Sequence, residues 1–413
     1  MHDRHGRVVF KIFLWTQLLS FPFWGIFSLF PIILYKDLHA SPLQITLIST
    51  LKPLTAICAS YYHVRPRGQN ILSHLSWVHL LKFTPFLFFP FSRQPWFLIS
   101  SFALFMVLLR ASLPAWMEVL KVHLSHEQRG RALSYGVMID YLGAALLPFI
   151  FGWFLDNFHQ AWRWLFPMTA LIGMLPGWLI YRLPFVPLPS AFPKKIEKRK
   201  TWREHLTNPW KNCYYLLSVQ PHFLHFQVGF FLGGAGLMIM QPALPKYFVD
   251  CLHLSYTSLL LAITSFKGVG LVFSSPIWTR AFKPTKILAL CGVVTFIASS
   301  FPLFLMLAQH HFFFLFLAYF AYGVMQGGSE LSWKMSGPIF AKDKDSMPYS
   351  SANVLFVGIR GAIFPIIGTY LCSYTPISPM VVGGFFCVAG GIYLWNVQRR
   401  MTSHYEEEGR VRC

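Results

Sequence analysis

Charge is the scarcest property of this sequence. Only 12% of its 413 residues are charged, and 15 acidic residues stand against 35 lysines and arginines. Soluble globular chains carry roughly 25% charged residues, so this composition excludes an ordinary soluble protein. The hydrophobic share of 55% can supply many spans of about 20 apolar residues each. It leaves too little for a separate soluble domain.

Signatures of catalysis and metal binding are also missing. The seven cysteines form no CxxC pair and the sixteen histidines form no HExxH pattern, so neither a zinc site nor a disulfide framework is expected. No N-x-S/T sequon occurs. No loop shows a nucleophile–base spacing or is long enough for a catalytic domain. The sequence therefore predicts neither an enzyme nor a cofactor.

Twelve apolar segments are present instead. Backbone polar groups in lipid must bond within their own segment, so we expect these segments to be helices. The roughly 10-residue alternation of a transmembrane barrel is absent. The expected spans are 10–35, 42–63, 70–91, 95–119, 132–155, 162–183, 223–249, 256–278, 285–307, 312–335, 348–373 and 376–397.

The basic residues predict the topology of these spans. With the N-terminus inside, cytoplasmic segments hold 25 of the 35 lysines and arginines, external loops hold 4 and the spans hold 6. An excess of Lys and Arg is retained on the cytoplasmic side of membrane proteins. The net charge of +20 is therefore attributed to topology and not to nucleic-acid binding. Both termini are expected in the cytoplasm.

The two halves of the chain repeat. The motif LHAS at 38–41 corresponds to LHLS at 252–255, at an offset of 214 (252 − 38), and Trp116 corresponds to Trp333 at an offset of 217 (333 − 116). Further matches at these two offsets are Pro31 with Pro245, Ser112 with Ser329 and Pro148 with Pro365. We expect an all-α membrane protein of two pseudo-symmetric six-helix bundles, 10–183 and 223–398. A cytoplasmic basic linker, 184–222, joins them, and a tail, 399–413, follows.

Partial motifs make the chain resemble the major facilitator superfamily over about residues 10–400. Helix 5 of that family often carries G-x-x-x-G-P-x-x-G-G, of which Gly143, Pro148 and Gly152 are present. Helix 4 often carries R-x-x-Q-G, of which Arg110 remains, and the loop after helix 2 keeps only its last basic position, Arg67. The resemblance implies a secondary transporter whose two halves alternate access to a site at the midplane.

Six charged residues fall near the middle of the expected spans. A charge at that depth costs at least about 2.5–3.5 kcal/mol on insertion scales, which makes it a functional-site candidate. The resemblance implies that all six lie on helices that line or flank the cavity, whereas Lys82 does not. The six are Lys52, Arg110, Asp140, Lys267, Glu330 and Arg360.

Two ion pairs are expected among them, Arg110 with Asp140 and Glu330 with Arg360. Each pair either ties two neighbouring helices together or takes part in proton transfer. Buried pairs contribute little net stability, because desolvation can cancel their attraction. The resemblance implies a proton-coupling role for the helix 4 arginine, which favours Asp140 as the protonatable group, with Glu330 as the second candidate.

Lys52 and Lys267 would then have no acidic partner. Two ammonium groups facing one cavity favour a bound carboxylate or phosphate. The alternative is that both snorkel or bond helix carbonyls. Arg110 and Arg360 are further substrate-binding candidates.

A cytoplasmic gate is a separate expectation. Glu118 and Lys334 lie near matching cytoplasmic ends of helices 4 and 10 and could form a salt bridge in one state only. The plain alternative is two solvated helix ends.

These observations predict a secondary active transporter, a symporter or antiporter, of a small anionic solute. Coupling to H⁺ is a further hypothesis. The alternatives are an exporter of amphipathic compounds or lipids and a transporter-like sensor that does not transport. We expect a monomeric, multi-pass protein of the bacterial inner (plasma) membrane that binds a small molecule and no nucleic acid or metal.

Overall fold

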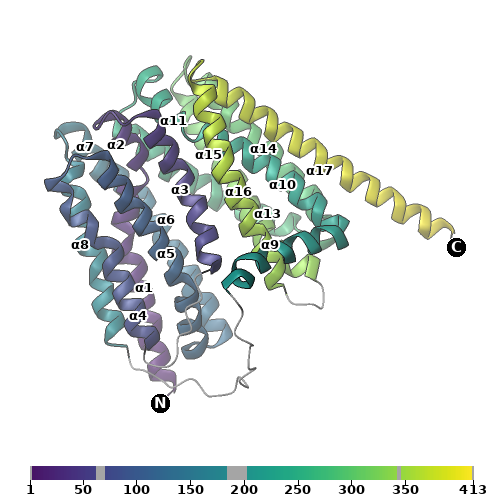
Figure 1. Cartoon of the computed structure of the whole chain (residues 1–413), viewed down its shortest axis with the longest axis horizontal. Helices are drawn as coiled ribbons and strands as arrows, with labels where there is room; N and C mark the ends of the chain where they lie inside the picture. Colours follow the sequence, from purple (N-terminus) through teal and green to yellow (C-terminus); the bar gives the residue numbers. More distant parts are fainter. Residues whose placement is uncertain (1, 62–69, 184–201, 342–345, 412–413) are drawn as a thin grey trace. The chain divides into compact units, whose positions relative to one another are not determined.

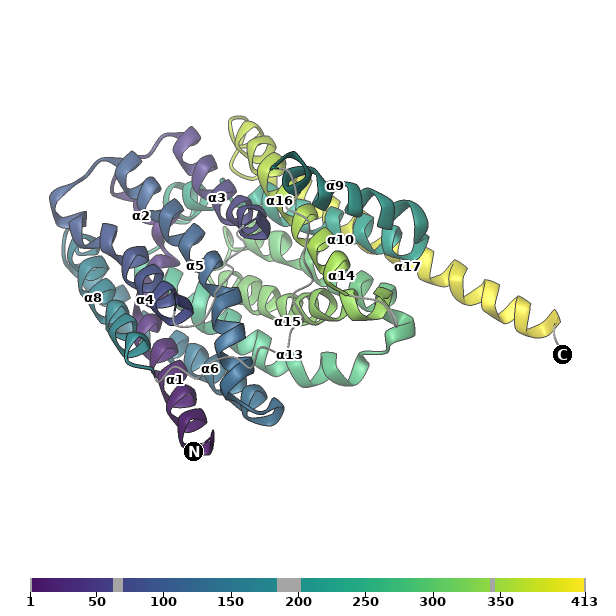
Figure 2. The same cartoon turned by 60° about the horizontal axis from the view of Figure 1, so that its bottom comes forward.

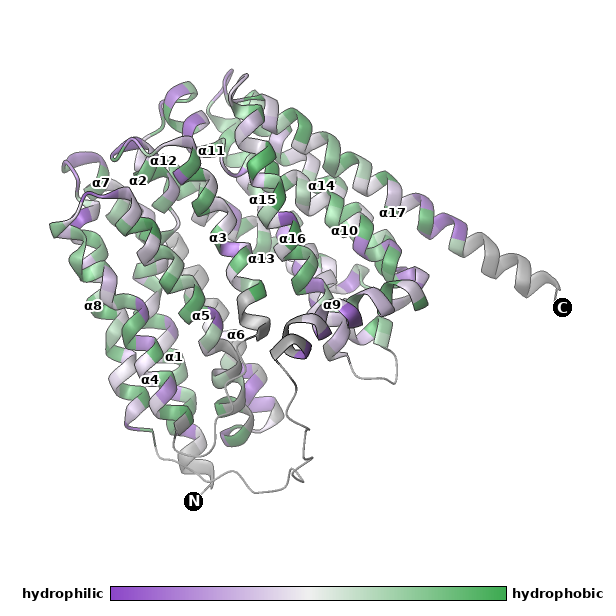
Figure 3. Cartoon of the chain, in the orientation of Figure 1, coloured by the Kyte–Doolittle hydropathy of each residue, from purple (hydrophilic) through white to green (hydrophobic). Residues whose placement is uncertain are grey.

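A computed structural model of the chain describes residues 2–61, 70–183, 202–341 and 346–411. Within these ranges every regular element is a helix (Figure 1). Hydrophobic residues follow most of the length of the helices, and hydrophilic residues gather toward their ends (Figure 3). This distribution is that of helices that cross a bilayer, so the prediction of an all-α membrane protein is confirmed.

The helices up to residue 183 follow the six apolar segments of the first half. They are α1 (His2–Phe27), α2 (Phe30–Lys36), α3 (Pro42–Tyr61), α4 (Asn70–Phe83), the 3-10 helix η1 (Thr84–Phe91), α5 (Pro95–His123), α6 (His126–Leu147), the π-helix η2 (Pro148–Gly152), α7 (Trp153–Asn157) and α8 (Trp162–Tyr181).

The helices of the second half follow the other six segments. They are α10 (Pro221–Met240), α11 (Leu244–Lys246), the π-helix η3 (Tyr247–Cys251), α12 (Tyr256–Leu260), the π-helix η4 (Leu261–Phe266), α13 (Lys267–Ala281), the 3-10 helix η5 (Pro284–Lys286), α14 (Ile287–Leu307), α15 (Phe313–Ala341), α16 (Met347–Cys372) and α17 (Ser378–Val411). The last of them, α17, extends beyond its neighbours (Figures 1 and 2).

Eight of the described helical stretches are long and apolar enough to cross a membrane. The count of twelve spans and the cytoplasmic location of both termini remain predictions. One helix lies outside the twelve expected spans, within the expected basic linker 184–222. This helix is α9 (Trp202–Val219), which packs against α16 and α10.

By their internal contacts the helices form two compact units. Unit 1 comprises Met1–Lys200 together with Leu254–Ser265, and unit 2 comprises Thr201–His253 and Phe266–Cys413. The short segment Leu254–Ser265 therefore lies in the second half of the sequence but packs as part of unit 1.

Aromatic side chains fill the interior of unit 1. The ring of Phe23 on α1 lies 4.9 Å from Phe83, 4.7 Å from Phe86 and 4.9 Å from Phe105, measured between ring centroids. All four rings are buried. Because edge-to-face and tilted ring pairs contribute about 0.5–1.5 kcal/mol beyond the area they bury, this cluster ties α1 to α4, η1 and α5.

Glycines set the close helix crossings of unit 2. A side chain at Gly270 on α13 would fall on the backbone carbonyl of Phe320 on α15, and one at Gly323 on α15 would fall on the carbonyl of Lys267. Small residues let helix backbones approach where lipid supplies no hydrophobic driving force between them. Figure 2 shows α13 and α15 lying side by side.

The internal repeat is visible in the backbone. His39 and His253, which occupy the same place in the repeated motif, both adopt a left-handed conformation, with φ of 49° and 47°. The serine two residues later caps the next helix in each case, since the hydroxyls of Ser41 and Ser255 accept hydrogen bonds from the N–H groups of Gln44 and Ser258.

An aromatic contact repeats as well. Phe13 packs edge-on to Trp116, with centroids 5.5 Å apart, and Phe230 packs against Trp333 at 5.9 Å. The same offset of 217 relates both members of the two pairs (333 − 116 and 230 − 13). The repeat that the sequence indicates is therefore expressed in equivalent helix–helix contacts of the first and fourth helices of each half.

We expect Gly270→Ala to lower the thermal stability of the protein, because the added methyl group meets backbone rather than a movable side chain. Overpacking of this kind costs about 1–3 kcal/mol. The matched control is Gly384→Ala, where the nearest atom to the added carbon is the Pro302 Cγ at 3.3 Å. Fluorescence-detected thermal unfolding measures both variants. Equal melting temperatures for the two would contradict the assignment of Gly270 to a closed crossing.

Candidate substrate site

Two cations lie on neighbouring helices of unit 1. Lys52 lies in the middle of α3, and Arg110 lies on α5, which packs along α3. Like charges on neighbouring helices repel one another, and a negative charge bound between them would offset that repulsion.

Neither cation has an acidic partner among the side chains that the structure describes. Arg110 is half-buried, and its Nε is enclosed without a hydrogen-bond partner. Lys52 keeps access to solvent. Its helix is locally fixed by side-chain hydroxyls, since Thr55 Oγ1 donates to the Lys52 carbonyl over 2.9 Å. A guanidinium and an ammonium group are therefore both available to a ligand.

The side chain of Asp140, the expected partner of Arg110, is not among those that the structure describes. The backbone of α6 is described at Asp140, but the side chain is not, and the same holds for Glu118 on α5. The predicted Arg110–Asp140 pair and the predicted gate between Glu118 and Lys334 therefore remain predictions.

Arg360 is a buried cation of unit 2. Its side chain on α16 is only 8% exposed, its Nη1 donates to the carbonyl of Phe230 over 2.7 Å, and its guanidinium lies 5.1 Å from the centre of the Phe230 ring. Room for it is made by Gly234, where any side chain would overlap the guanidinium. Its Nε has no partner. The carbonyl and the ring stabilise the charge only in part.

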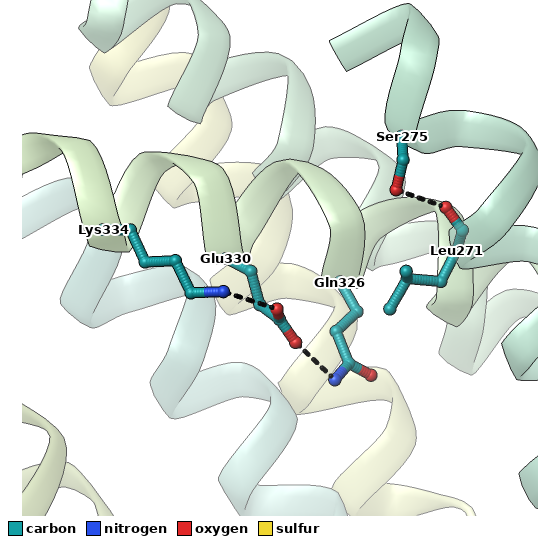
Figure 4. A network of polar contacts seen from close by, with 5 residues as sticks. All are labelled: Leu271, Ser275, Gln326, Glu330 and Lys334. Carbon is teal, nitrogen blue, oxygen red and sulfur yellow. Dashed lines mark hydrogen bonds and ion pairs between the residues drawn. The ribbon is translucent and has the colours of Figure 1, made fainter. Parts of the chain in front are cut away.

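Glu330 does not form the expected pair with Arg360. Its carboxylate binds two residues of its own helix instead, Lys334 at 3.3 Å and Gln326 at 3.1 Å (Figure 4). The spacing of four residues places all three on one face of α15. The Glu330 and Lys334 side chains are 48% and 67% exposed, so this pair lies at an accessible surface of unit 2. The ion pair with Lys334 on the same helix stands in place of the expected pair with Arg360.

Lys267 is the first residue of α13, directly after the π-helix η4. Its ammonium lies 5.8 Å from the centre of the Tyr322 ring, and the residue makes a further interaction. The structure therefore gives no support for the expectation that Lys267 lacks a partner.

Two buried basic residues of unit 1 were underrated from the sequence. Lys82 is 5% exposed, with its ammonium 4.9 Å from the centre of the Phe83 ring and 5.9 Å from that of Phe105. His79, one turn earlier, places its Nε2 2.9 Å from the carbonyl of Gly173 on α8. The sequence signal that could have indicated this site is the occurrence of two basic residues three positions apart in an apolar segment. Lys82 was set aside because its helix was expected to lie outside the cavity.

A buried amide network of unit 2 was missed altogether. Gln227 on α10 donates to the side-chain oxygen of Asn353 on α16, and Asn353 donates to the Ser336 hydroxyl on α15 over 2.8 Å. All three residues are at most 2% exposed. Single polar residues in spans are common, and nothing in the sequence shows that these three meet.

Within the described ranges no group of three or more His, Cys, Asp or Glu residues could hold a metal ion.

Comparison with known proteins identifies the family. A family model described as Major Facilitator Superfamily matches residues 12–336. This chain therefore belongs to the major facilitator superfamily of membrane transporters. It is a multi-pass integral membrane protein and a transporter of a small molecule, so the predictions of family, transport and lack of enzymatic activity are confirmed.

Solved structures show the same fold at low identity. A POT family transporter in complex with 5-aminolevulinic acid is similar with a TM-score of 0.70 at 12% identity, over 97% of both chains. A peptide transporter POT in complex with sulfate gives 0.67 at 15% identity, over 95% of this chain and 94% of that chain. The nucleoside transporter NupG gives 0.60 at 12% identity, over 95% and 99%. No curated protein sequence matches the chain.

We expect Glu330→Gln to change the stability of unit 2 very little, because an exposed ion pair contributes about 0.3–0.5 kcal/mol. Asn353→Leu should destabilise by about 1–3 kcal/mol, because it leaves the Gln227 amide buried without its partner and removes the bond that the Ser336 hydroxyl accepts. Thermal unfolding of the purified variants compares the two. A larger loss in Glu330→Gln than in Asn353→Leu would contradict this description.

Proposed function

We propose that this transporter carries a small organic anion and that Lys52 and Arg110 of unit 1 bind its negative charge. The observation that supports the proposal is the presence of two cations on the packed helices α3 and α5, with no acid bound to either among the described side chains. In surroundings of low dielectric constant, unbalanced charge is unfavourable unless a ligand balances it. A carboxylate or phosphate can accept hydrogen bonds from both groups at once.

The chemistry of the two groups sets different roles. The planar guanidinium of Arg110 offers two parallel N–H donors, which match the two oxygens of a carboxylate. The ammonium of Lys52 is a point charge on a flexible stem and tolerates ligands of different shape. We therefore assign to Arg110 the orientation of the bound solute and to Lys52 the neutralisation of its negative charge.

Arg360 and Lys267 are proposed as the substrate-binding cations of unit 2. Arg360 retains an unpartnered Nε, and the rings of Phe230 and Trp333 pack against one another beside it. This combination suits a solute with a planar or apolar part in addition to its charge.

Proton coupling is proposed to use Asp140, with Glu330 as the second candidate. An acid next to Arg110 would compete with the anion for the guanidinium, so protonation of the acid would favour anion binding. Glu330 is already held by Lys334 and Gln326, which makes it a weaker candidate. Twelve spans, cytoplasmic termini, a monomeric state and a location in the bacterial plasma membrane complete the proposal.

We expect Lys52→Gln and Arg110→Gln each to weaken anion binding by about tenfold or more, since a hydrogen bond to a charged group contributes about 1.5–3 kcal/mol. The measurement is competition uptake in proteoliposomes with a panel of radiolabelled small carboxylates and phosphates. Glu127→Gln is the matched control, because this exposed acid pairs with Arg131 on its own helix. Transport confined to neutral or cationic compounds would overturn the proposal.

For proton coupling, Asp140→Asn should abolish accumulation against a gradient while exchange of solute between equal pools persists. The reason is that exchange needs binding and conformational change, but no net proton transfer. An imposed pH gradient across proteoliposomes tests the first and counterflow tests the second. Unchanged pH-driven uptake would remove Asp140 from the mechanism.

Export of amphipathic compounds is the second candidate function. The helix 5 pattern that suggested it ends in the π-helix η2, which starts at Pro148 and closes at Gly152. A π segment inside a helix frequently marks a functional position. Efflux of a fluorescent amphipathic dye from cells that express the protein would favour this candidate over anion transport.

A further inference from the structure

An acid of unit 1 caps the helix of a segment that lies 100 residues further along the chain. The carboxylate of Asp156 on α7 accepts hydrogen bonds from the backbone N–H of Tyr256 over 2.7 Å and of Thr257 over 3.0 Å. It also accepts one from the Thr257 hydroxyl over 2.7 Å. Both carboxylate oxygens are used, and the donors are the first N–H groups of α12, which have no partner within their own helix.

The capped segment belongs to a span that packs on both units. Tyr256–Ala281 is one membrane-crossing stretch. Its first part, through Ser265, packs within unit 1, whereas its continuation α13 packs against α15 of unit 2. The π-helix η4, Leu261–Phe266, lies where the two parts join.

Other residues of unit 1 also contact the N-terminus of α12. The ammonium of Lys36 lies 4.4 Å from the centre of the Tyr256 ring, and Gly152 lets the backbone of Thr257 approach, since a side chain there would come within 2.5 Å of the Thr257 Cα. The carboxyl of Asp37 faces the Tyr256 hydroxyl. Burial raises the pKa of Asp37, although the charges of Lys36 and His159 oppose that rise.

Movement of the two units during transport would act on these contacts. If the two units move relative to one another, a helix packed on both must either leave one of them or bend between them. The cap is suited to reversible opening, because Asp156 and the Thr257 bonds are exposed and water can replace the hydrogen bonds. A π segment is a place where a helix readily changes its geometry.

We propose that the Asp156 cap is a latch that holds Leu254–Ser265 on unit 1 in one state of the transport cycle and releases it in another. Asp156 is then a positioning residue for transport, acting on conformation rather than on the solute. The inference rests on transport by the family and not on the proposed anion, so the two can fail separately. No metal, cofactor or proton transfer is required for the latch.

The test measures the distance between α7 and the capped segment directly. Spin labels are introduced through non-natural amino acids at Asn157 and Leu261 of the full-length protein in lipid nanodiscs, and double electron–electron resonance gives the distance distribution. Asp156→Asn should raise the ratio of long to short distances by about tenfold, which corresponds to about 1.4 kcal/mol. The amide nitrogen of Asn cannot accept the bonds that a carboxylate oxygen accepts.

Two further variants make the result specific. Thr257→Val removes one of the three hydrogen bonds and should shift the distance distribution in the same direction, but by less. This variant serves as the test if Asp156→Asn does not fold. Glu127→Gln removes a carboxylate elsewhere in unit 1 and should leave the distribution unchanged. A distribution that is the same in the parent and in both cap variants would show a static cap and overturn the proposal. No solute is added, so the outcome is independent of what the protein transports.

Discussion

The cost of placing charge inside apolar segments is the constraint on which this protein depends. Each interior charge must find hydrogen bonds, an opposite charge or water. Arg360 is stabilised by the Phe230 carbonyl and ring. Glu330 is stabilised by Lys334 on the next turn of its helix. Lys52 and Arg110 lie on the packed helices α3 and α5 and have no described acidic partner, which is why the proposed function centres on them.

The fold was largely predictable because its signals are local and periodic. The described part of each expected span is mainly helical, because apolar segments of this length satisfy their backbone hydrogen bonds as helices in a bilayer. The repeat was also readable, and the left-handed His39 and His253 show that equivalent motifs form equivalent turns. The helix α9 was missed, because its sequence is polar on average and gains its order from packing on α16 and α10.

The candidate site was less predictable, because contacts between helices depend on their rotation and depth. Counting along a span places a charge to within a turn, and that error decides whether Glu330 meets Arg360 or Lys334. The Glu330 carboxylate pairs with Lys334, one turn further along its own helix. The Asp156 cap on α12 joins residues about 100 positions apart, and the sequence carries no signal for this contact. The packing of α3, which carries Lys52, on α5, which carries Arg110, is likewise not readable from the sequence.

Closely packed helix crossings and contacts that can open reversibly lie in different parts of the chain. Gly270 and Gly323 bring α13 and α15 together backbone to backbone, which makes this a closely packed crossing. The cap at Asp156 is exposed and consists of hydrogen bonds that water can replace. A transporter needs both kinds of contact, because its units must keep their shape while the contacts that distinguish its states form and break.

Ligand-induced thermal stabilisation of the purified protein tests the central claim, that the interior cations serve an anionic solute. The panel consists of matched sets, each a small acid with its neutral amide and its amine analogue, since a ligand at 100 times its Kd stabilises by about 2.7 kcal/mol. The account predicts that stabilisation follows the acids alone. Equal stabilisation by the neutral amides, or stabilisation by the amines only, would contradict it.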